Sequence, residues 1–416
     1  MCDLAALPDS PWPQRNPILL KSLMSNQTLL EKPIEARVAD MAALFAASAV
    51  ERDECGGTPK AQRDALRESG LLAMSIPRSF GGDGLGWRQT LNAVRILASV
   101  DSSVAHVFGF HHLMLATVRL FGNEAQWGAW YEQTAQRRWF WGNALNPLDR
   151  RTIATRCGNW YEFSGPKSFC SGALDSEMMI ASAYDVKGTE LLIGTLPSAR
   201  TGIEISSDWN NMGQRQTDSG TVAFHKVRVE GHELLRDPGP LSTPFACLRP
   251  IIAQLVLTNV FLGIAEGAFD DAKHYTLKES RPWHTAGVDT TSDDPLILSQ
   301  YGEFWVALES ARALSDRAAD KLDEAWLIGA GLTKAQRGEV ALAAACAKVA
   351  ASETGLNICS RMFDVTGARA THGGLRLDRH WRNIRTHTLH DPLAYKIKEL
   401  GEWALKSQYP TPSFYS

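Results

Sequence analysis

The sequence predicts an α+β protein in which a helical region, a β domain and a second helical region follow one another. Apolar residues recur at steps of three and four positions over about residues 28–139 and again over 250–416, which is the period of one helix face. Over residues 140–249, short strand-like runs alternate with turn residues at a spacing of about ten residues. This spacing favours a small antiparallel barrel or sandwich over βαβ units.

The N-terminal part of the chain divides into a lead-in and a helical domain. We expect residues 1–27 to be disordered because they contain four prolines and no clear period. Translation that starts naturally at Met24 is an alternative explanation of this segment. The helical domain, 28–139, carries one apolar stripe from Ile34 to Phe45 and a second from Leu91 to Val118.

The β domain and the C-terminal domain are predicted from different periods. In the β domain, Thr221 to Val229 alternates apolar and polar residues, and Ser164–Lys167 is expected to form a turn between two strands. In the C-terminal domain, Thr333–Thr366 is expected to be a long helix, with a capping box at Thr333 and Gln336 and a terminating glycine at Gly367. The amphipathic stretch Gly302–Trp326 precedes it, so we expect a four-helix bundle.

Composition excludes several classes of partner. The 416 residues contain 43 Lys plus Arg and 46 Asp plus Glu, a net charge of −3, which gives no basic excess for binding nucleic acid. The most apolar run, Ile251 to Ala265, is shorter than the roughly 20 residues that cross a bilayer, so no membrane span is expected. The seven cysteines are dispersed, which favours reduced thiols in the cytoplasm.

Common catalytic motifs are missing from the sequence. The loop Phe80–Gly84 is rich in glycine, but no buried strand precedes it and the G-x-G-x-x-G spacing fails at Trp87, so it is not a dinucleotide fingerprint. Neither a Walker A loop, nor H-E-x-x-H, nor a G-x-S-x-G elbow is present. We therefore expect no metal site and no bound nicotinamide cofactor.

Two histidine-rich stretches remain as candidates for chemistry. The first places His106, His111 and His112 in an apolar helix, where a single histidine is more often a core residue. Three histidines so close together weaken that interpretation, because each buried imidazole needs hydrogen-bond partners. The second ends in His390 and Asp391, just before a proline that disfavours helix; a surface capping segment is the alternative.

The chain resembles the acyl-CoA dehydrogenase superfamily over nearly its whole length from about residue 28, with motifs in that family's order and spacing. The motifs are Pro77–Gly82, similar to the family's P-x-x-Y-G-G loop, Gly165–Ser171, similar to its G-x-K-x-W-I-T strand, and Asn211–Arg215 with Val227–Val229, similar to its M-G-x-R…V-x-V stretch. Within the superfamily, further segments are similar to two-component flavin monooxygenases of the dibenzothiophene monooxygenase type. These segments are His106–His111, Asn143–Pro147, Arg281–Trp283, Gly367–Arg369 and Arg385–Lys396.

That resemblance implies a reduced-flavin-dependent monooxygenase. In this branch a separate NAD(P)H-flavin reductase supplies reduced FMN or FAD, which reacts with molecular oxygen to give a C4a-hydroperoxyflavin. The substrate would be a small apolar organosulfur compound, amine or aromatic molecule. The resemblance also implies a cytoplasmic homotetramer, built as a dimer of dimers.

The resemblance assigns roles to individual residues. The expected catalytic residues are His390 and His106, which would form or stabilise the hydroperoxide. The expected flavin-binding residues are Asn143 and Ser171 at the isoalloxazine ring, and Arg281, Gly367, Ala368 and Arg369 near the phosphate. The expected substrate-pocket residues are Phe110, where this branch has tyrosine, His111 and Asp391. An ordinary strand hydroxyl for Ser171 and a surface charge for Arg281 are the alternatives.

Two other functions remain open from the sequence. Asp391 falls where many dehydrogenases carry the glutamate that removes the α-proton of an acyl thioester, so an FAD-dependent acyl-CoA dehydrogenase is one alternative. Aspartate is one methylene shorter, and a misplacement of about 1 Å can cost roughly 100-fold in rate. A flavin-binding oligomer without catalysis is the other alternative.

Overall fold

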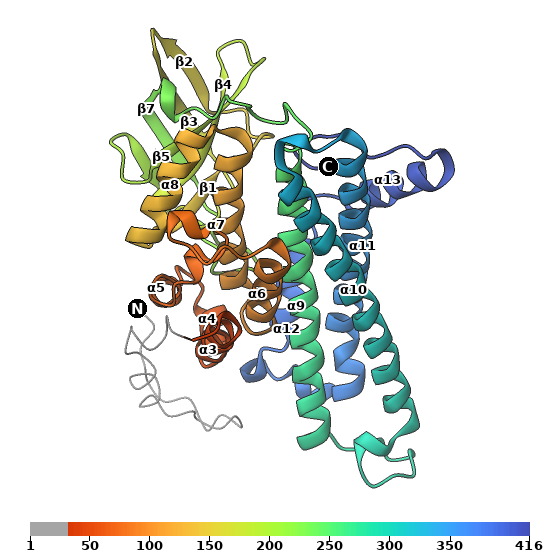
Figure 1. The fold of residues 1–416 in the computed structure, drawn as a ribbon. Helices are drawn as coiled ribbons and strands as arrows, with labels where there is room; N and C mark the ends of the chain where they lie inside the picture. The colour runs from red at the N-terminus through yellow and green to blue at the C-terminus, as the bar shows by residue number, and fades with distance from the viewer. Residues whose placement is uncertain (1–31) are drawn as a thin grey trace.

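The computed structural model describes residues 32–416, which form a helical domain, a curled sheet and a set of long helices (Figure 1). The expected disordered lead-in, 1–27, lies outside the described residues. Helices give way to strands between Arg137 and Trp141, close to the expected boundary at 139/140. The last strand ends at Glu230 and the next long helix begins at Leu248, close to the expected boundary at 249/250.

The N-terminal helices pack around α7, which is apolar and almost wholly buried. Asp101 caps this helix, because its carboxylate accepts a hydrogen bond from the backbone N–H of Val104. Helix α7 contacts β1 on one side and α9 on the other, so it lies between the sheet and the long helices. The elements of this domain are α3 Ile34–Ala46, α4 Ala49–Cys55, α5 Lys60–Glu68, η1 Leu71–Ala73, η2 Arg78–Phe80, α6 Trp87–Val100, α7 Ser102–Phe121 and α8 Glu124–Arg137.

The middle of the chain forms one seven-stranded sheet with the order β1-β4-β2-β3-β7-β6, and β5 pairs with the other edge of β4. An apolar core lies inside the curl, formed by side chains such as Phe163, Phe224 and Val227. The strands are β1 Trp141–Ala144, β2 Ile153–Cys157, β3 Trp160–Lys167, β4 Met178–Asp185, β5 Leu191–Pro197, β6 Ile203–Ile205 and β7 Val222–Glu230, followed by η3 Gly231–Glu233.

Two details of the sheet differ from the sequence prediction. The expected turn at Ser164–Lys167 is wrong, because these residues continue β3 past a bulge between Phe163 and Gly165. The expected antiparallel pairing is only partly right, since β4 runs parallel to both β1 and β2. The fold class itself, α+β with this domain order, is confirmed.

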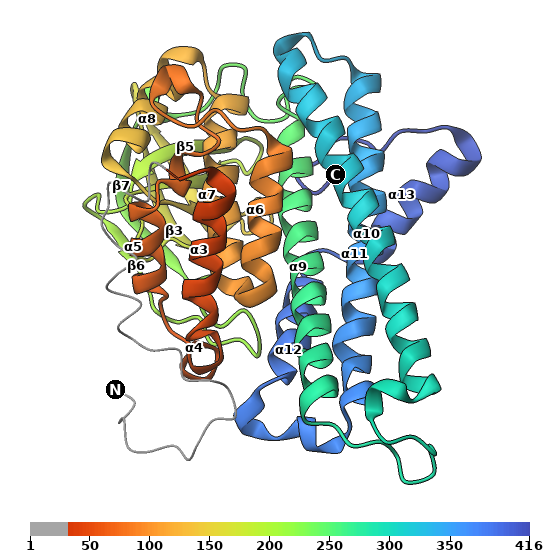
Figure 2. The same cartoon turned by 60° about the horizontal axis from the view of Figure 1, so that its bottom comes forward.

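Three long helices dominate the C-terminal region and lie side by side, with α13 projecting from them (Figure 2). The capping box of Thr333 and Gln336 and the terminating Gly367 are confirmed at the two ends of α11. The expected fourth bundle helix is replaced by two short helices, α12 and α13. The bounds are α9 Leu248–Lys278, η4 Thr291–Asp293, α10 Pro295–Ile328, η5 Gly329–Gly331, α11 Lys334–Thr366, η6 Ala368–Thr371, η7 Gly373–Leu375, α12 Asp378–His387 and α13 Leu393–Lys406.

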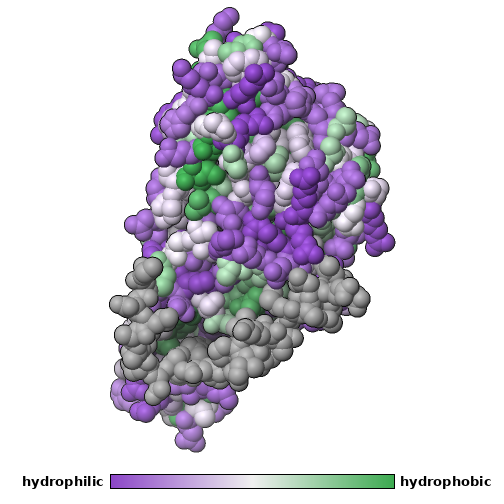
Figure 3. Space-filling model, turned by 90° about the vertical axis from the view of Figure 1, so that its left-hand side faces the viewer, coloured by the Kyte–Doolittle hydropathy of each residue, from purple (hydrophilic) through white to green (hydrophobic). Residues whose placement is uncertain are grey.

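Helices α7 and α9 are long and apolar enough to cross a membrane by length and composition. In both, 94% of the apolar window is buried inside the protein, as in the core helices of a soluble protein. The expected apolar run at Ile251–Ala265 is therefore only part of a helix of 31 residues. The face seen in Figure 3 is mostly hydrophilic, in keeping with apolar residues gathered in the interior.

Helices α6 and α9 approach so closely that Gly267 has no room for a side chain. A Cβ atom at Gly267 would lie 2.0 Å from the backbone oxygen of Ser99. We expect Gly267→Ala to lower the free energy of unfolding by about 1–3 kcal/mol through overpacking. The matched control is Gly302→Ala on the exposed face of α10, where nothing lies within 4 Å. This change should raise stability by up to about 1 kcal/mol. The free energy of unfolding of both variants, measured by urea denaturation, tests these two expectations. Equal changes in the two variants would contradict the packing argument.

Candidate active site

The candidate active site lies between α7, β1, α9 and the segment that joins α12 to α13. His106 of α7 and His387 of α12 have ring centroids 4.5 Å apart, and Phe261 of α9 lies 6.3 Å from the ring of His387. On the sheet side, the backbone N–H of Asn143 donates to the oxygen of Ser171 at 2.9 Å. The two predicted halves of the site, on α7 and after α12, therefore meet.

His106 is a buried imidazole without a hydrogen-bond partner. It is 3% exposed, and neither ring nitrogen is bonded to any described residue. Its ring packs on Phe110, with centroids 4.1 Å apart. Burial, helped by nearby His390, lowers the pKa of His106 to about 3, so the ring is neutral at physiological pH and offers one donor and one acceptor. Buried polar groups are normally bonded, so these two nitrogens indicate a place for a bound molecule.

His387 belongs to the same cluster, although the sequence analysis did not select it. The ring is buried, and its Nδ1 also lacks a partner among the described residues. Burial, together with the neighbouring His106 and His390, holds the pKa of His387 well below its usual range. The signal available in the sequence was the three-residue spacing between His387 and His390 at the end of a helix.

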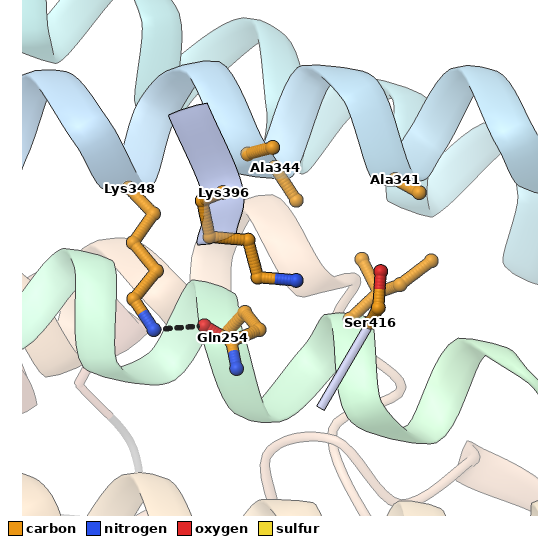
Figure 4. A pocket seen from close by; sticks show the side chains of 8 residues that line it. Gln254, Ala341, Ala344, Lys348, Lys396 and Ser416 are labelled. Carbon is orange, nitrogen blue, oxygen red and sulfur yellow. Dashed lines mark hydrogen bonds between the residues drawn. The ribbon is translucent and has the colours of Figure 1, made fainter. Parts of the chain in front are cut away.

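His390 and Asp391 are held by a buried lysine from α11. Lys348 Nζ lies 2.6 Å from Oδ1 of Asp391 and also donates to the side-chain oxygen of Gln254, as Figure 4 shows for the lysine–glutamine pair. His390 Nδ1 lies 3.0 Å from the same Asp391 oxygen. Burial raises the pKa of Asp391, but the bonds to His390 and Lys348 outweigh it and hold the pKa well below the usual range. Asp391 is therefore an anion, and His390 donates through Nδ1 and keeps Nε2 for a bound molecule.

This arrangement makes Asp391 a poor base. A general base works best when its pKa lies near the working pH, whereas Asp391 holds its charge against a buried ammonium. The structure therefore disfavours the alternative in which Asp391 removes an α-proton as an acyl-CoA dehydrogenase. Asp391 instead orients His390 through the hydrogen bond at Nδ1, so its influence on a bound molecule is exerted through that histidine.

The polar residues on the sheet side form a connected group. Asn143 is a buried residue of β1, and its Oδ1 accepts from the N–H of Leu145 at 3.1 Å. Ser171 Oγ is 2.8 Å from Ser219 Oγ, which is 2.7 Å from Thr217 Oγ1. This chain of hydroxyls holds the Ser171 loop next to α7, where Gly172 lies against Val107. The structure thus places the Ser171 loop and Asn143 beside α7 near Val107, the residue that follows His106.

Four of the predicted flavin-binding residues lie far from Asn143 and Ser171 within one chain. They are Arg281, Gly367, Ala368 and Arg369. Arg281 follows the end of α9, and Ser280 donates to the oxygen of Thr366 at the end of α11, so Arg281 and Gly367–Arg369 share one end of the long helices. Gln254, which contacts Asp391, lies 24 residues before the end of α9, or about 36 Å along the helix. Arg281 and Arg369 are exposed at this distant end.

His111 was expected to line the substrate pocket, and the structure corrects this. Its Nε2–H donates to the oxygen of Leu72 at 2.7 Å, and its Nδ1 accepts from the backbone N–H of Trp141 at 3.1 Å. Both nitrogens are therefore used to join η1 and β1 to α7. His111 is a structural residue with no exposed surface. Among residues 32–416, no group of three or more His, Cys, Asp or Glu side chains is arranged to hold a metal ion.

Comparison with known proteins identifies the family. Models of the acyl-CoA dehydrogenase N-terminal and C-terminal domains match residues 31–138 and 255–394. A probable FMNH2-dependent monooxygenase of Pseudomonas putida is 63% identical over 92% of this chain and 98% of its own length. The chain belongs to the acyl-CoA dehydrogenase superfamily. Within this superfamily it lies in the branch of the flavin-dependent monooxygenases, as the resemblance implied.

Two solved structures of this branch of the superfamily match closely. The methanesulfinate monooxygenase of Pseudomonas fluorescens is 63% identical, with a TM-score of 0.92, covering 92% of this chain and all of its own. The FMN-bound dibenzothiophene monooxygenase of Paenibacillus sp. A11-2 is 39% identical, with a TM-score of 0.87, covering 92% and 99% of the two chains. These relatives support FMN in preference to FAD, which the sequence analysis had left open.

Proposed function

We infer that this chain is the oxygenase component of a two-component monooxygenase that uses reduced FMN and molecular oxygen to oxidise a small organosulfur compound. The observation that carries this inference is the cluster of His106, His387 and His390, which leaves unpartnered ring nitrogens beside a charged, buried orienting group. Such nitrogens fit a bound polar ring system and a reacting oxygen species better than they fit a sealed core.

The cofactor would supply the redox chemistry, and the protein would position it. When bound, reduced FMN would supply two electrons to molecular oxygen, and one atom of that oxygen would be inserted into the substrate. Asn143 and Ser171 would face the isoalloxazine ring. His390 donates its Nδ1–H to Asp391, so it would accept a hydrogen bond or a proton at Nε2, and neutral His106 would offer a donor. Phe110 and Phe261 would exclude water from the reacting oxygen.

The phosphate of FMN would need a second copy of the chain. Phe261, which lies beside the His106–His387 pair, is 17 residues before the end of α9, or about 26 Å along the helix. One FMN therefore does not reach both His106 and the end that carries Arg281 and Gly367–Arg369 within one chain. Guanidinium groups suit bidentate phosphate binding. We therefore propose that these residues come from a neighbouring subunit, in a homotetramer arranged as a dimer of dimers. A separate NAD(P)H-flavin reductase would supply reduced FMN in the cytoplasm.

The substrate that the comparisons favour is an alkanesulfinate. The methanesulfinate enzyme is 63% identical to this chain, whereas the dibenzothiophene enzyme is 39% identical. The balanced reaction is R–SO2⁻ + O2 + FMNH2 giving R–SO3⁻ + H2O + FMN. One oxygen atom forms the new S–O bond, and the other leaves as water with the two hydrogens of the reduced flavin.

A product assay tests this proposal. We expect the protein, supplied with a flavin reductase, NADH, FMN and ¹⁸O2, to convert methanesulfinate into methanesulfonate that carries one ¹⁸O atom, detected by mass spectrometry. Dibenzothiophene should react more slowly. Acyl-CoA substrates should leave the spectrum of oxidised FAD or FMN unchanged without oxygen. Release of hydrogen peroxide alone, with every sulfur substrate recovered, would contradict the proposal.

A further inference from the structure

One buried arginine next to the candidate site has no anionic partner. Four arginines are less than one-tenth exposed in the described part of the chain, and three of them bind carboxylates or carbonyl oxygens. Arg63 pairs with Asp218 at 2.8 Å, Arg37 pairs with Asp83 at 3.0 Å, and Arg337 donates to backbone oxygens such as that of Pro410 at 3.0 Å. The fourth is Arg249, at 6% exposure.

The contacts of Arg249 are few and weak. Its Nε donates a long hydrogen bond of 3.4 Å to Thr117 Oγ1, and among the described residues no carboxylate lies within ion-pair distance of its guanidinium. Burial lowers the pKa of Arg249 to about 10, which still leaves it charged at neutral pH. An uncompensated buried charge is costly, so proteins seldom keep one unless a bound ion neutralises it.

Arg249 is linked to the histidines through α7 and through the C-terminal segment. Thr117 is 11 residues after His106 on α7, about three turns of helix, so both residues are on one face. Tyr415 connects Arg249 to the other side of the site, because its ring centroid is 6.1 Å from that of His390. Burial raises the pKa of the Tyr415 phenol, and the Arg249 guanidinium lowers it, so the charge of Arg249 acts on Tyr415.

The other ionisable groups near the histidines do not neutralise Arg249. Lys348 and Asp391 neutralise each other in a direct ion pair. His106 and His387 are neutral because burial keeps their pKa values low. The positive charge of Arg249 is therefore not neutralised by any of these groups.

We propose that Arg249 is the group that binds the anionic sulfinate or sulfonate head of the substrate, with the phenol of Tyr415 beside it. The proposal rests on the proposed function, since it names how that site selects its substrate. A planar guanidinium donates two parallel hydrogen bonds to a pair of oxygens, which the –SO2⁻ group supplies. Small alkanesulfinate monoanions are then preferred to neutral thioethers and to dibenzothiophene.

Direct binding to the purified full-length protein without flavin tests this proposal. The probe is methanesulfonate, the expected product, measured by isothermal titration calorimetry. We expect Arg249→Met to weaken binding by about 10- to 100-fold, the loss of hydrogen bonds to a charged group. Arg249→Lys should retain part of the affinity. The control, Arg317→Met, removes an exposed arginine on α10 and should leave binding unchanged.

The melting temperature provides a second measurement. Without ligand, Arg249→Met should melt at the same temperature as the wild type or higher, because it removes an unpaired buried charge. Wild-type binding, or a lower melting temperature, in Arg249→Met would overturn the proposal and indicate a structural arginine.

The anion site and the proposed function can fail separately. If the wild-type protein binds methanesulfonate but forms no product with reductase and oxygen, the proposed function fails and the anion site stands. If it oxidises methanesulfinate and Arg249→Met does so with unchanged KM, the anion site fails and the proposed function stands.

Discussion

His390→Ala is expected to lower the rate of sulfur oxygenation by about 10²- to 10⁴-fold, the usual contribution of a positioned proton donor or acceptor. The reason lies in the geometry around this ring. Asp391 accepts a hydrogen bond from Nδ1–H of His390 at 3.0 Å, and an ion pair with Lys348 holds Asp391 in place. These contacts fix both the tautomer of His390 and the direction in which its Nε2 points. Alanine removes that nitrogen and leaves the rest of the pocket in place, since His390 is only partly buried and packs loosely.

The measurement compares the product formed with the hydrogen peroxide released, for each NADH consumed. In His390→Ala, product should fall and hydrogen peroxide should rise, because reduced flavin still reacts with oxygen when this ring nitrogen is missing. His390→Gln keeps a hydrogen-bonding group but cannot carry a proton, and we expect it to fall between alanine and the wild type. The control is His232→Ala, an exposed histidine of the β domain. A variant lacking His390 that kept wild-type coupling would show that this histidine has no part in the chemistry.

The helices of this protein were predictable because their signals are local. Thr333 and Gln336 cap α11, and Gly367 ends it at a positive φ of 79°. The strands were less predictable, because Gly165–Pro166 has the composition of a turn and pairs with β7 only through a bulge. Likewise, no local pattern distinguishes the parallel pairing of β1 with β4.

The same difference between local and distant contacts applies to the site. His106 and His390 stood out as members of dense histidine clusters, and the resemblance to flavin monooxygenases ranked them. Lys348 and Arg249, in contrast, lie in ordinary helical sequence, with no unusual residues on either side. Lys348 meets Asp391 from 43 residues away, and Arg249 differs from other arginines only in the partners it lacks. Such features depend on burial and pairing, which appear only once the chain is folded.

Lys348→Met is expected to make oxygenation depend on pH in a way that the wild-type protein does not. The carboxylate of Asp391 faces Lys348 from α11, His390 from its own segment, Gln254 from α9 and Tyr415 from the C-terminal segment. Lys396 and Glu399 of α13 lie nearby as a pair of opposite charge, 3.0 Å apart. Burial raises the pKa of Asp391, and Lys348 is one of the two groups that lower it. Removing Lys348 therefore raises that pKa.

In Lys348→Met, Asp391 then takes up a proton as the pH falls, and protonated Asp391 no longer fixes the Nδ1–H tautomer of His390. Activity should fall on the acid side and recover as the pH rises through the new pKa. Asp391→Asn should be impaired at every pH, because its side chain never ionises. Lys348→Arg should restore much of the wild-type profile, since it keeps the positive charge. A uniform loss at all pH values in Lys348→Met would indicate general misfolding and contradict a positioning role.

Stability provides an independent test of the same ion pair, with a weaker acid dependence expected in Lys348→Met than in the wild type. In the wild type the folded-state pKa of Asp391 is depressed, so its contribution is present above the unfolded pKa and is lost as the pH falls through the folded pKa. In Lys348→Met the folded-state pKa of Asp391 is less depressed, so the variant loses less stability than the wild type as the pH falls. At neutral pH, breaking the buried pair should cost about 3–5 kcal/mol. The double variant Lys348→Met, Asp391→Asn should recover part of this loss, because it leaves no buried charge unpaired. Additive losses in the double variant would show that the two side chains stabilise the fold separately.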